Sequence, residues 1–309
     1  MKIVAAEPLG LPVEEIVAVC RETVGEDIEL KIYEDRAADE AELICRCSDA
    51  EIIVEVNQPL TASFFEKCPN LQYVAVAFAG MDHIDMEACA AHGVKVGNCP
   101  GYSASAVAVL VFGYLAVLKR NLLDFDTAVR KGDVRGGFVG TEIGGKTFGI
   151  IGFGHIGAAV ARIALAYGCE VLAYSRTPKN FAGVSFVSLE ELLHRSDIVS
   201  LHLPLTDASR GMIDAEQIAM MKEGAFLINT ARGPIVDSAA LAAALDSGHL
   251  GGAGIDVFET EPPISPDHPL LQCGKLIATP HIGFATVEAF ETRLQMSFQN
   301  IADFLTKMK

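Results

Sequence analysis

Short apolar runs alternate with helical patterns along the first hundred residues of the chain. The strand-like runs are rich in β-branched residues, as expected for strands in a sheet, and they cover 2–5, 29–33, 51–56, 71–77 and 94–96. Helical patterns start between them, near Pro12, Ala38, Thr61 and Ile84. This alternation predicts a parallel sheet that is covered by helices on both faces.

A second alternating series begins at Lys146. Its expected strands are 148–151, 170–174, 198–203, 225–229, 254–257 and 276–278. Six strands in this arrangement are typical of a nucleotide-binding sheet. Ser188 with Glu191 three residues later is a capping box, and Asp237 can cap the helix that follows it. A last helical pattern, 288–308, could return to the first domain.

Composition and charge exclude several classes of partner. A length of 309 residues, half of them hydrophobic, is enough for two globular domains. The formal charge of -16 argues against nucleic acid and against an anionic membrane surface, because both are bound through Lys and Arg. The eight cysteines lack zinc-type spacing, and the N-terminus starts as a strand rather than as a signal peptide. We therefore expect a cytoplasmic protein with reduced thiols and no metal.

The longest apolar stretch is 106–118, and only Gly113 interrupts it. It is too short to span a bilayer, which requires about 20 residues. We expect a helix that is buried on nearly all sides, against another domain or another subunit.

A glycine motif, Gly-Phe-Gly-His-Ile-Gly, covers residues 152–157, directly after an apolar strand and at the start of a helix. In such a motif Gly152 allows a tight turn, Gly154 lets the backbone approach a pyrophosphate, and Gly157 lets the helix pack closely on the strand. The first amides of the helix, at His155 and Ile156, would face the phosphates. The motif in this context predicts a dinucleotide-binding site.

The residues after the second strand of this series bear on the choice of cofactor. An NAD site usually has Asp or Glu there for the ribose hydroxyls, but Ser175, Arg176 and Thr177 follow Tyr174. These side chains suit a 2′-phosphate, with which the Arg176 guanidinium could pair as a planar fork. We predict NADP. In the alternative, Arg176 stacks on adenine in a site that accepts NAD as well.

Three chemically active residues, Arg232, Glu261 and His281, each come shortly after an apolar strand. Because the carboxyl ends of parallel strands meet at one edge of a sheet, we expect these residues to share a crevice. His281 would give a proton to a carbonyl oxygen while hydride arrives from the nicotinamide. Glu261 would orient His281 and favour the imidazolium form, and Arg232 would hold a substrate carboxylate.

Further cofactor contacts are expected at the same strand ends. Thr230 and Ala231 lie in the turn before Arg232, and Asp256 ends a strand. The Asp256 carboxylate could accept a hydrogen bond from the nicotinamide carboxamide, although a helix-capping role is an open alternative.

The order and spacing of these motifs resemble those of the D-isomer-specific 2-hydroxyacid dehydrogenases, especially the glyoxylate and hydroxypyruvate reductases. The matching segments are 152–157, Asn229 to Gly233, Asp256 to Glu259 with Glu261 and Pro262, and Thr279 to Gly283. The resemblance implies hydride transfer between NAD(P)H and a 2-oxo acid, giving a D-2-hydroxy acid, with glyoxylate or hydroxypyruvate as a small substrate.

The resemblance also implies an architecture. It predicts a flavodoxin-like substrate domain from residues 1–98 and 286–309, and an inserted Rossmann domain from residues 99–285, both with parallel sheets. It implies a homodimer through the helix after Pro100. It further implies that the loop 78–82, with Phe78 and the amides of Ala79 and Gly80, binds the substrate carboxylate.

The chain departs from the family at two places. Val109 and Leu110 stand where many relatives have Glu-His, which argues against the phosphoglycerate branch, and the acid missing at Ser175 leaves the cofactor open. Two other functions remain as alternatives, a dinucleotide-sensing corepressor-like protein and a phosphite dehydrogenase with a similar triad. A formate dehydrogenase would have an amide in place of Glu261.

Overall fold

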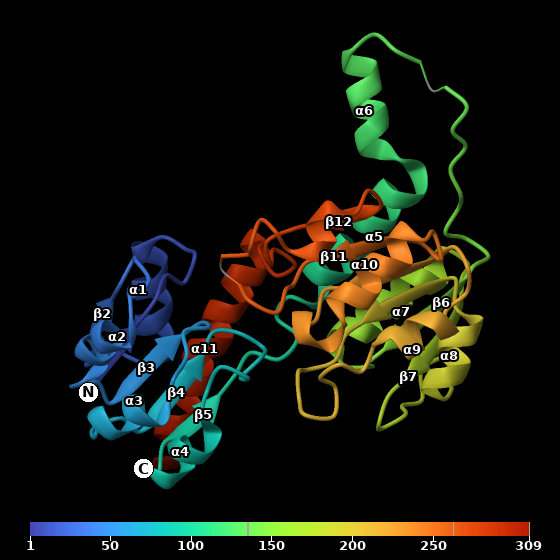
Figure 1. Cartoon of the computed structure of the whole chain (residues 1–309). Helices are drawn as coiled ribbons and strands as arrows, with labels where there is room; N and C mark the ends of the chain where they lie inside the picture. Colours follow the sequence, from blue (N-terminus) through green and yellow to red (C-terminus); the bar gives the residue numbers. More distant parts are fainter. Residues whose placement is uncertain (135, 262, 309) are drawn as a thin grey trace. The chain divides into compact units, whose positions relative to one another are not determined.

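The computed structural model describes residues 1–134, 136–261 and 263–308. The chain forms two compact units (Figure 1). Unit 1 comprises Met1–Tyr102 and Ala285–Lys309, and unit 2 comprises Ser103–Phe284. Pro262, which is part of a motif used above, and Lys309, at the end of the expected substrate domain, lie outside the described residues. The roles expected for the two parts of the chain stay predictions.

Unit 1 is a five-stranded parallel sheet with the strand order β2-β1-β3-β4-β5. This is the flavodoxin-like order, in which the direction of winding reverses between β1 and β3. Strands β3 and β4 are buried along their whole length, which explains why their sequences are apolar except for Glu55 at the end of β3. The elements are β1 Lys2–Ala5, α1 Val13–Thr23, β2 Glu29–Ile32, α2 Glu40–Cys47, β3 Ile52–Glu55, α3 Ala62–Lys67, β4 Tyr73–Val76, α4 Met86–Ala91, β5 Lys95–Gly97 and α11 Val287–Met308.

Unit 2 has a seven-stranded parallel sheet with the order β12-β11-β10-β9-β6-β7-β8. Its elements are α5 Ala104–Arg120, α6 Leu122–Arg130, β6 Thr147–Ile151, α7 His155–Ala166, β7 Glu170–Tyr174, β8 Val184–Phe186, α8 Leu189–Arg195, β9 Ile198–Leu201, α9 Ala215–Met220, β10 Ala225–Asn229, α10 Ser238–Asp246, β11 Leu250–Ile255 and β12 Leu276–Ala278, with short 3-10 turns at Gly233–Ile235 and Pro269–Gln272.

The predicted α/β class with two parallel sheets is confirmed, but the number of strands in the second sheet was wrong. The sequence predicts six strands, and β8 is the seventh. It is a three-residue edge strand without a fully buried side chain, so its apolar pattern is too short to be distinguished from a loop. Ser188 and Asp237 do cap α8 and α10, as predicted.

The apolar helix expected at 106–118 is α5, and its neighbours lie within unit 2. It packs against α7, β11 and β12, and buries side chains such as Val111 and Leu115. Val109 remains 64% exposed. The next helix, α6, buries no described side chain and extends away from the sheet of unit 2 (Figure 1). The exposed apolar surface is therefore mainly on α6 rather than on α5.

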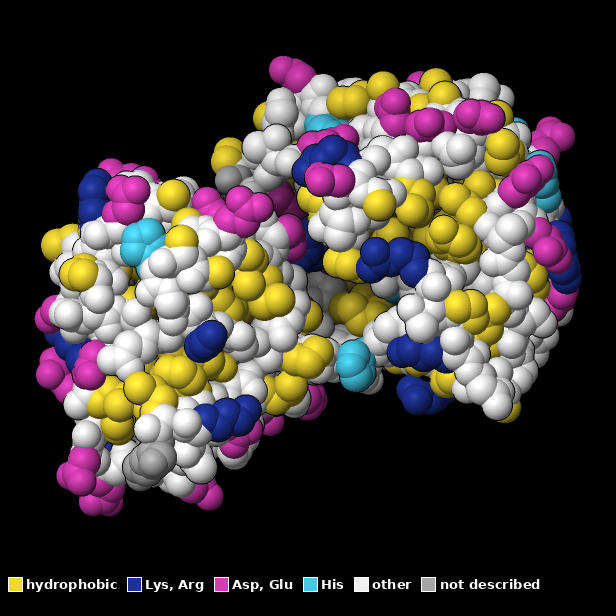
Figure 2. All heavy atoms as spheres, turned by 90° about the horizontal axis from the view of Figure 1, so that it is seen from below, with side chains coloured by type: hydrophobic (Ala, Val, Ile, Leu, Met, Phe, Trp, Pro, Cys, Tyr) yellow, Lys and Arg dark blue, Asp and Glu magenta, His cyan; other side chains and the backbone are white. Residues whose placement is uncertain are grey.

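Two surface properties complete the description. No single described helix is long and apolar enough to cross a bilayer, and α5 and α6 pass that test only as a pair bent by 60°. Acidic side chains are spread over the visible face of each unit rather than gathered in one patch (Figure 2).

Candidate active site

The three predicted catalytic residues lie after three neighbouring strands of unit 2. Arg232 follows β10, Glu261 follows β11 and His281 follows β12. These strands pair in parallel, β10 with β11 and β11 with β12. Their carboxyl ends therefore share one edge of the sheet, where side chains from distant parts of the sequence can meet.

His281 and Glu261 are in direct contact. The His281 Nδ1 atom lies 2.6 Å from Glu261 Oε1, and the other carboxylate oxygen accepts a hydrogen bond of 2.9 Å from the Phe258 amide. Both oxygens are thus engaged, which fixes the direction of the carboxylate. Each of the two paired side chains is 21% exposed, so the imidazole remains reachable from outside.

His281 has a left-handed backbone conformation, with a φ of 53°. This conformation costs a non-glycine residue roughly 1–2 kcal/mol, so the surrounding structure has to hold it. The His281 amide donates to two carbonyl oxygens, that of Asp256 at 2.7 Å and that of Thr279 at 3.1 Å.

The Asp256 carboxylate holds the turn 279–283, which contains His281. Its Oδ1 accepts from the Ile282 amide at 2.8 Å and from the Thr279 hydroxyl, and its Oδ2 accepts from the Gly283 amide at 2.7 Å. Asp256 is only 1% exposed. Burial raises the pKa of this carboxyl, against the lowering effect of the Thr279, Ile282 and Gly283 hydrogen bonds and of the nearby His281.

Asp256 has two expected roles, a cofactor contact and a helix cap. The carboxylate caps none of the described helices; it accepts from the turn 279–283 and, at 3.5 Å, from the Tyr114 hydroxyl of α5. The contact with the nicotinamide stays a prediction. No sequence pattern shows that Asp256 would bind the turn after a neighbouring strand, because the partners are 23 to 27 residues away.

The turn that carries Arg232 is fixed by the Asn229 side chain. The Asn229 amide oxygen accepts from the Ala231 backbone at 3.0 Å, and its nitrogen donates to the Arg232 carbonyl at 2.9 Å. A Cβ atom on Gly233 would lie 2.0 Å from the backbone of Phe258, so this turn presses against the segment after β11. The Thr230 hydroxyl is buried and has no hydrogen-bond partner among the described residues.

The glycine motif has the geometry that a dinucleotide requires. Gly152 has a φ of 94°, and a Cβ there would lie 2.4 Å from the His202 carbonyl oxygen. A Cβ on Gly157 would lie 2.2 Å from the Gly152 carbonyl oxygen. Only glycine fits at either position, and space is left open beside Gly154, the residue just before α7. Helix α7 has no side-chain cap, so its first amides are available to a phosphate.

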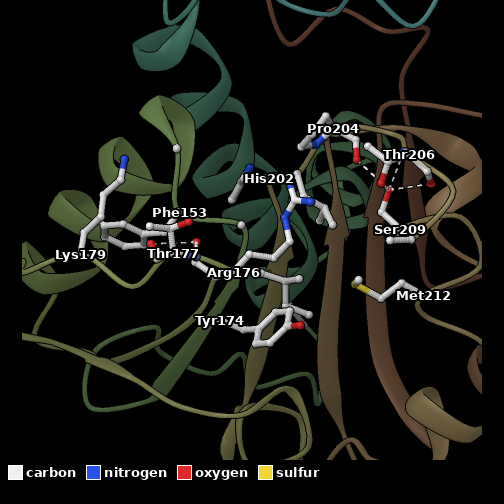
Figure 3. Close-up of a pocket in the computed structure, with 16 residues that line it drawn as sticks. Phe153, Tyr174, Arg176, Thr177, Lys179, His202, Pro204, Thr206, Ser209 and Met212 are labelled. Carbon is white, nitrogen blue, oxygen red and sulfur yellow. Dashed lines mark hydrogen bonds between the residues drawn. The ribbon is translucent and has the colours of Figure 1, made fainter.

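A cavity of about 380 Å³ lies over this motif, at the point where the strand order reverses between β6 and β9. Ser175, Arg176 and Thr177 line it, and Thr206 with Ser209 lie across from Arg176 and Thr177 (Figure 3). Their contact with a cofactor stays a prediction. The described lining residues include no Asp or Glu.

Lys179 and His202 are among the lining residues that the sequence did not predict. Lys179 brings a second positively charged side chain to the lining, and its position soon after β7 was the available indication. His202 also lines the cavity, and burial lowers its pKa to about 3, so it is neutral. Its Nε2 atom lies 2.8 Å from the Ser200 hydroxyl. Nothing in the sequence distinguishes His202 from a core histidine.

The loop predicted to bind the substrate carboxylate lies in unit 1, after β4. Two of its carbonyl oxygens accept hydrogen bonds from residues just after β5. The Phe78 carbonyl accepts from the Cys99 amide at 2.9 Å, and the Ala79 carbonyl accepts from the Asn98 side chain at 2.7 Å. The amides of Ala79 and Gly80 donate to no acceptor in the described part of the chain. They are therefore available to an anion.

Comparison with known proteins decides the family. The family model described as "D-isomer specific 2-hydroxyacid dehydrogenase, NAD binding domain" matches residues 112–283. A glyoxylate reductase of Korarchaeum cryptofilum is 38% identical over 292 residues, which cover 91% of this chain and 88% of that protein. The chain belongs to the D-isomer specific 2-hydroxyacid dehydrogenase family. It is an NAD(P)-dependent oxidoreductase.

Two further relatives support this assignment. A hydroxypyruvate reductase of Thermotoga maritima is 40% identical over 241 residues, which cover 77% of this dehydrogenase and 79% of the relative. The solved structure of an acyclic imino acid reductase (Bsp5) in complex with NADPH and D-Arg superimposes with a TM-score of 0.91 at 30% identity, over 99% of this chain and 98% of that one. The similarity therefore extends over both units.

Proposed function

We propose that this dehydrogenase reduces a small 2-oxo acid, such as glyoxylate or hydroxypyruvate, to the D-2-hydroxy acid. The observation that carries the proposal is the hydrogen bond of 2.6 Å between His281 and Glu261 at the strand edge that also carries Arg232. The names of the most similar relatives, glyoxylate and hydroxypyruvate reductase, support the substrate class.

The proposed roles follow from the geometry of the pair. A nicotinamide cofactor supplies hydride to the carbonyl carbon of the substrate when bound. His281 binds Glu261 through Nδ1, and its Nε2 atom would donate the proton to the carbonyl oxygen. The carbonyl thus gains one hydride and one proton and becomes a hydroxyl group. Glu261 orients the ring for this transfer.

The substrate carboxylate needs donors, and two parts of the chain offer them. Arg232 can pair with a carboxylate as a planar fork. The amides of Ala79 and Gly80, in the loop that begins at Phe78, are a second candidate set of donors for a carboxylate. These assignments rest on the available amides of the loop and on the position of Arg232 at the end of β10.

For the cofactor we propose NADP as the preferred form, with NAD as the alternative. Ser175, Arg176 and Thr177 line the cavity, and its described lining residues include no acid that could receive ribose hydroxyls. The pyrophosphate would lie against the glycine motif and the first amides of α7. The remaining proposed contacts come from the glycine loop, from the turn after β10 and from the end of β11, at Gly152, Gly154, His155, Ile156, Gly157, Thr230, Ala231 and Asp256.

We also propose a homodimer in which α6 contacts a second copy of the chain. Leu123 and Val129 on α6 are 58% and 72% exposed, and Val134 and Val139 beyond it are exposed too. Such a helix needs a partner to bury its apolar side chains.

A cytoplasmic location remains as predicted, supported by the eight unpaired cysteines.

Replacement of His281 tests the proposed chemistry. The wild type should reduce glyoxylate or hydroxypyruvate with NADPH, and His281→Asn should lower kcat by about 10²-fold or more, because the proton donor is lost. Binding of NADPH, measured by fluorescence titration, should remain within about twofold, since His281 is not part of the cofactor cavity. An asparagine variant with the kcat of the wild type would remove His281 from the reaction.

Replacement of Arg176 tests the cofactor preference. Arg176→Ala should weaken NADPH binding by about tenfold or more and leave NADH binding nearly unchanged, because only NADPH carries the 2′-phosphate. Arg162→Ala, a change in the same unit on the α7 helix outside the cavity residues, is the control. An equal loss for both cofactors would show that Arg176 does not bind a 2′-phosphate.

Charges on α6 test the dimer. The wild type should sediment as a dimer, and the double variant Leu123→Lys/Val129→Lys should sediment as a monomer, because the charges would have to be buried unpaired. Met86→Lys is a control at an exposed apolar side chain on unit 1. A monomeric wild type, or a double variant that remains dimeric, would contradict the proposal. Leu110 in α5 is a poorer probe because it packs on the core of its own unit.

A further inference from the structure

A buried acid–base pair in unit 1 has no role in the function proposed so far. Glu55, the last residue of β3, is 0% exposed, and its Oε1 lies 2.8 Å from His83 Nε2. The His83 side chain is 12% exposed. Such a pair is expensive to bury, and the loss of one partner would leave an uncompensated polar group inside.

The pair lies at the carboxyl edge of the sheet, close to the point where the strand order reverses between β1 and β3. Another buried carboxylate, Glu7, follows β1, and its Oε1 accepts from three successive amides, those of Val56, Asn57 and Gln58, at 2.8 to 2.9 Å. The backbone that leaves β3 is therefore fixed by Glu7. Glu55 precedes this fixed segment and extends the same network toward His83.

The pKa values of both partners are raised. Burial raises the pKa of Glu55 to about 7, although the hydrogen bond and the charge of His83 oppose this. For His83, burial acts to lower the pKa, but the hydrogen bond and the charge of Glu55 outweigh it and the pKa is raised. Asp82 and Glu7 also raise the pKa of His83. The contact itself, at 2.8 Å, is a short hydrogen bond between two side chains that are largely withdrawn from solvent.

Glu55 bonds to both ends of the loop after β4. At the start of the loop, the Glu55 carbonyl accepts from the Ala77 amide at 2.7 Å. At its end, the Glu55 carboxylate binds the His83 side chain. The His83 carbonyl in turn accepts from the Leu60 amide at 3.0 Å, and the Ile84 amide donates to Met81 at 3.1 Å. The segment between these bonds contains the available amides of Ala79 and Gly80.

We propose that Glu55 and His83 are positioning residues for the loop 78–81, and that their hydrogen bond sets the Ala79 and Gly80 amides for the carboxylate of a 2-oxo acid. The proposal rests on the proposed function, because it takes the loop as the carboxylate site. Neither side chain touches the substrate. They hold the loop in its binding conformation before the substrate arrives, so that less conformational entropy is lost on binding.

The test compares three variants with a matched control. His83→Phe keeps a ring but removes Nε2, and Glu55→Leu removes the carboxylate. Each should raise the KM for glyoxylate by about tenfold and change kcat by less than about threefold. The reason is that the lost interaction binds the substrate equally in the ground state and in the transition state. In Glu55→Gln the amide oxygen can still accept from His83, so the KM should rise by less than about threefold. The Kd for NADPH should not change, since the cofactor cavity is built from unit 2.

Glu42→Gln is the control, because Glu42 is also a glutamate of unit 1 that binds a cationic side chain, that of Arg46, but it does not contact the loop. It should leave the KM unchanged. If a single variant fails to fold, the double variant Glu55→Leu/His83→Phe replaces both polar partners with apolar groups, which is often neutral for stability. Its KM should be no higher than that of the single variant with the higher KM. Once one partner is removed the hydrogen bond is already lost, so removal of the second partner adds no further loss.

Hydrogen exchange supplies a readout that does not depend on turnover. The amides of residues 78–84 should exchange about tenfold faster in His83→Phe than in the wild type or in Glu42→Gln. A wild type that reduces no 2-oxo acid would overturn the proposed function, and the exchange rates would still decide whether the pair positions the loop. An active wild type with an unchanged KM in His83→Phe and in the double variant would overturn the present inference.

Discussion

The Asp256 carboxylate supports the geometry on which the rest of the candidate site depends. It accepts hydrogen bonds from Thr279, Ile282 and Gly283, and so fixes the turn in which His281 has a left-handed backbone. Without these bonds an extended turn would be favoured by roughly 1–2 kcal/mol. The turn brings Nδ1 of His281 to Glu261, and Glu261 is itself fixed by the Phe258 amide. The proposed proton donor is therefore positioned by backbone contacts of two buried or half-buried carboxylates.

Unit 1 has the same kind of arrangement, in which a buried carboxylate binds the segment after a neighbouring strand. Glu7 follows β1 and accepts three amides of the segment after β3, while Glu55 binds His83 beyond β4. In both units a carboxylate near one strand end determines the path of the chain after another strand. Parallel sheets favour this arrangement, since strand ends from distant segments lie side by side and the amides that leave each strand need acceptors. The loops that carry the proposed substrate contacts are held in this way.

Much of this architecture could be predicted from the sequence, because hydrophobic periodicity reports burial directly. The strands, the glycine motif and the placement of Arg232, Glu261 and His281 after β10, β11 and β12 follow from apolar runs and from parallel pairing. Side-chain bonds between distant segments, such as that of Asp256 with the turn 279–283, leave no periodic pattern. The sequence also did not predict that α5 is buried within unit 2 while the exposed apolar side chains lie on α6. An apolar helical pattern shows that a helix is buried, but not which neighbour buries it.

Asp256→Asn tests the central claim, that this side chain positions His281. An amide can accept through one atom only, so at least one backbone amide of the turn loses its acceptor. The kcat for glyoxylate should fall by about tenfold or more, and the Kd for NADPH should rise by a smaller factor. Asp214→Asn, at the cap of α9 in the same unit, should leave both unchanged. A wild-type kcat in Asp256→Asn, or a weakened Kd with kcat intact, would contradict the account.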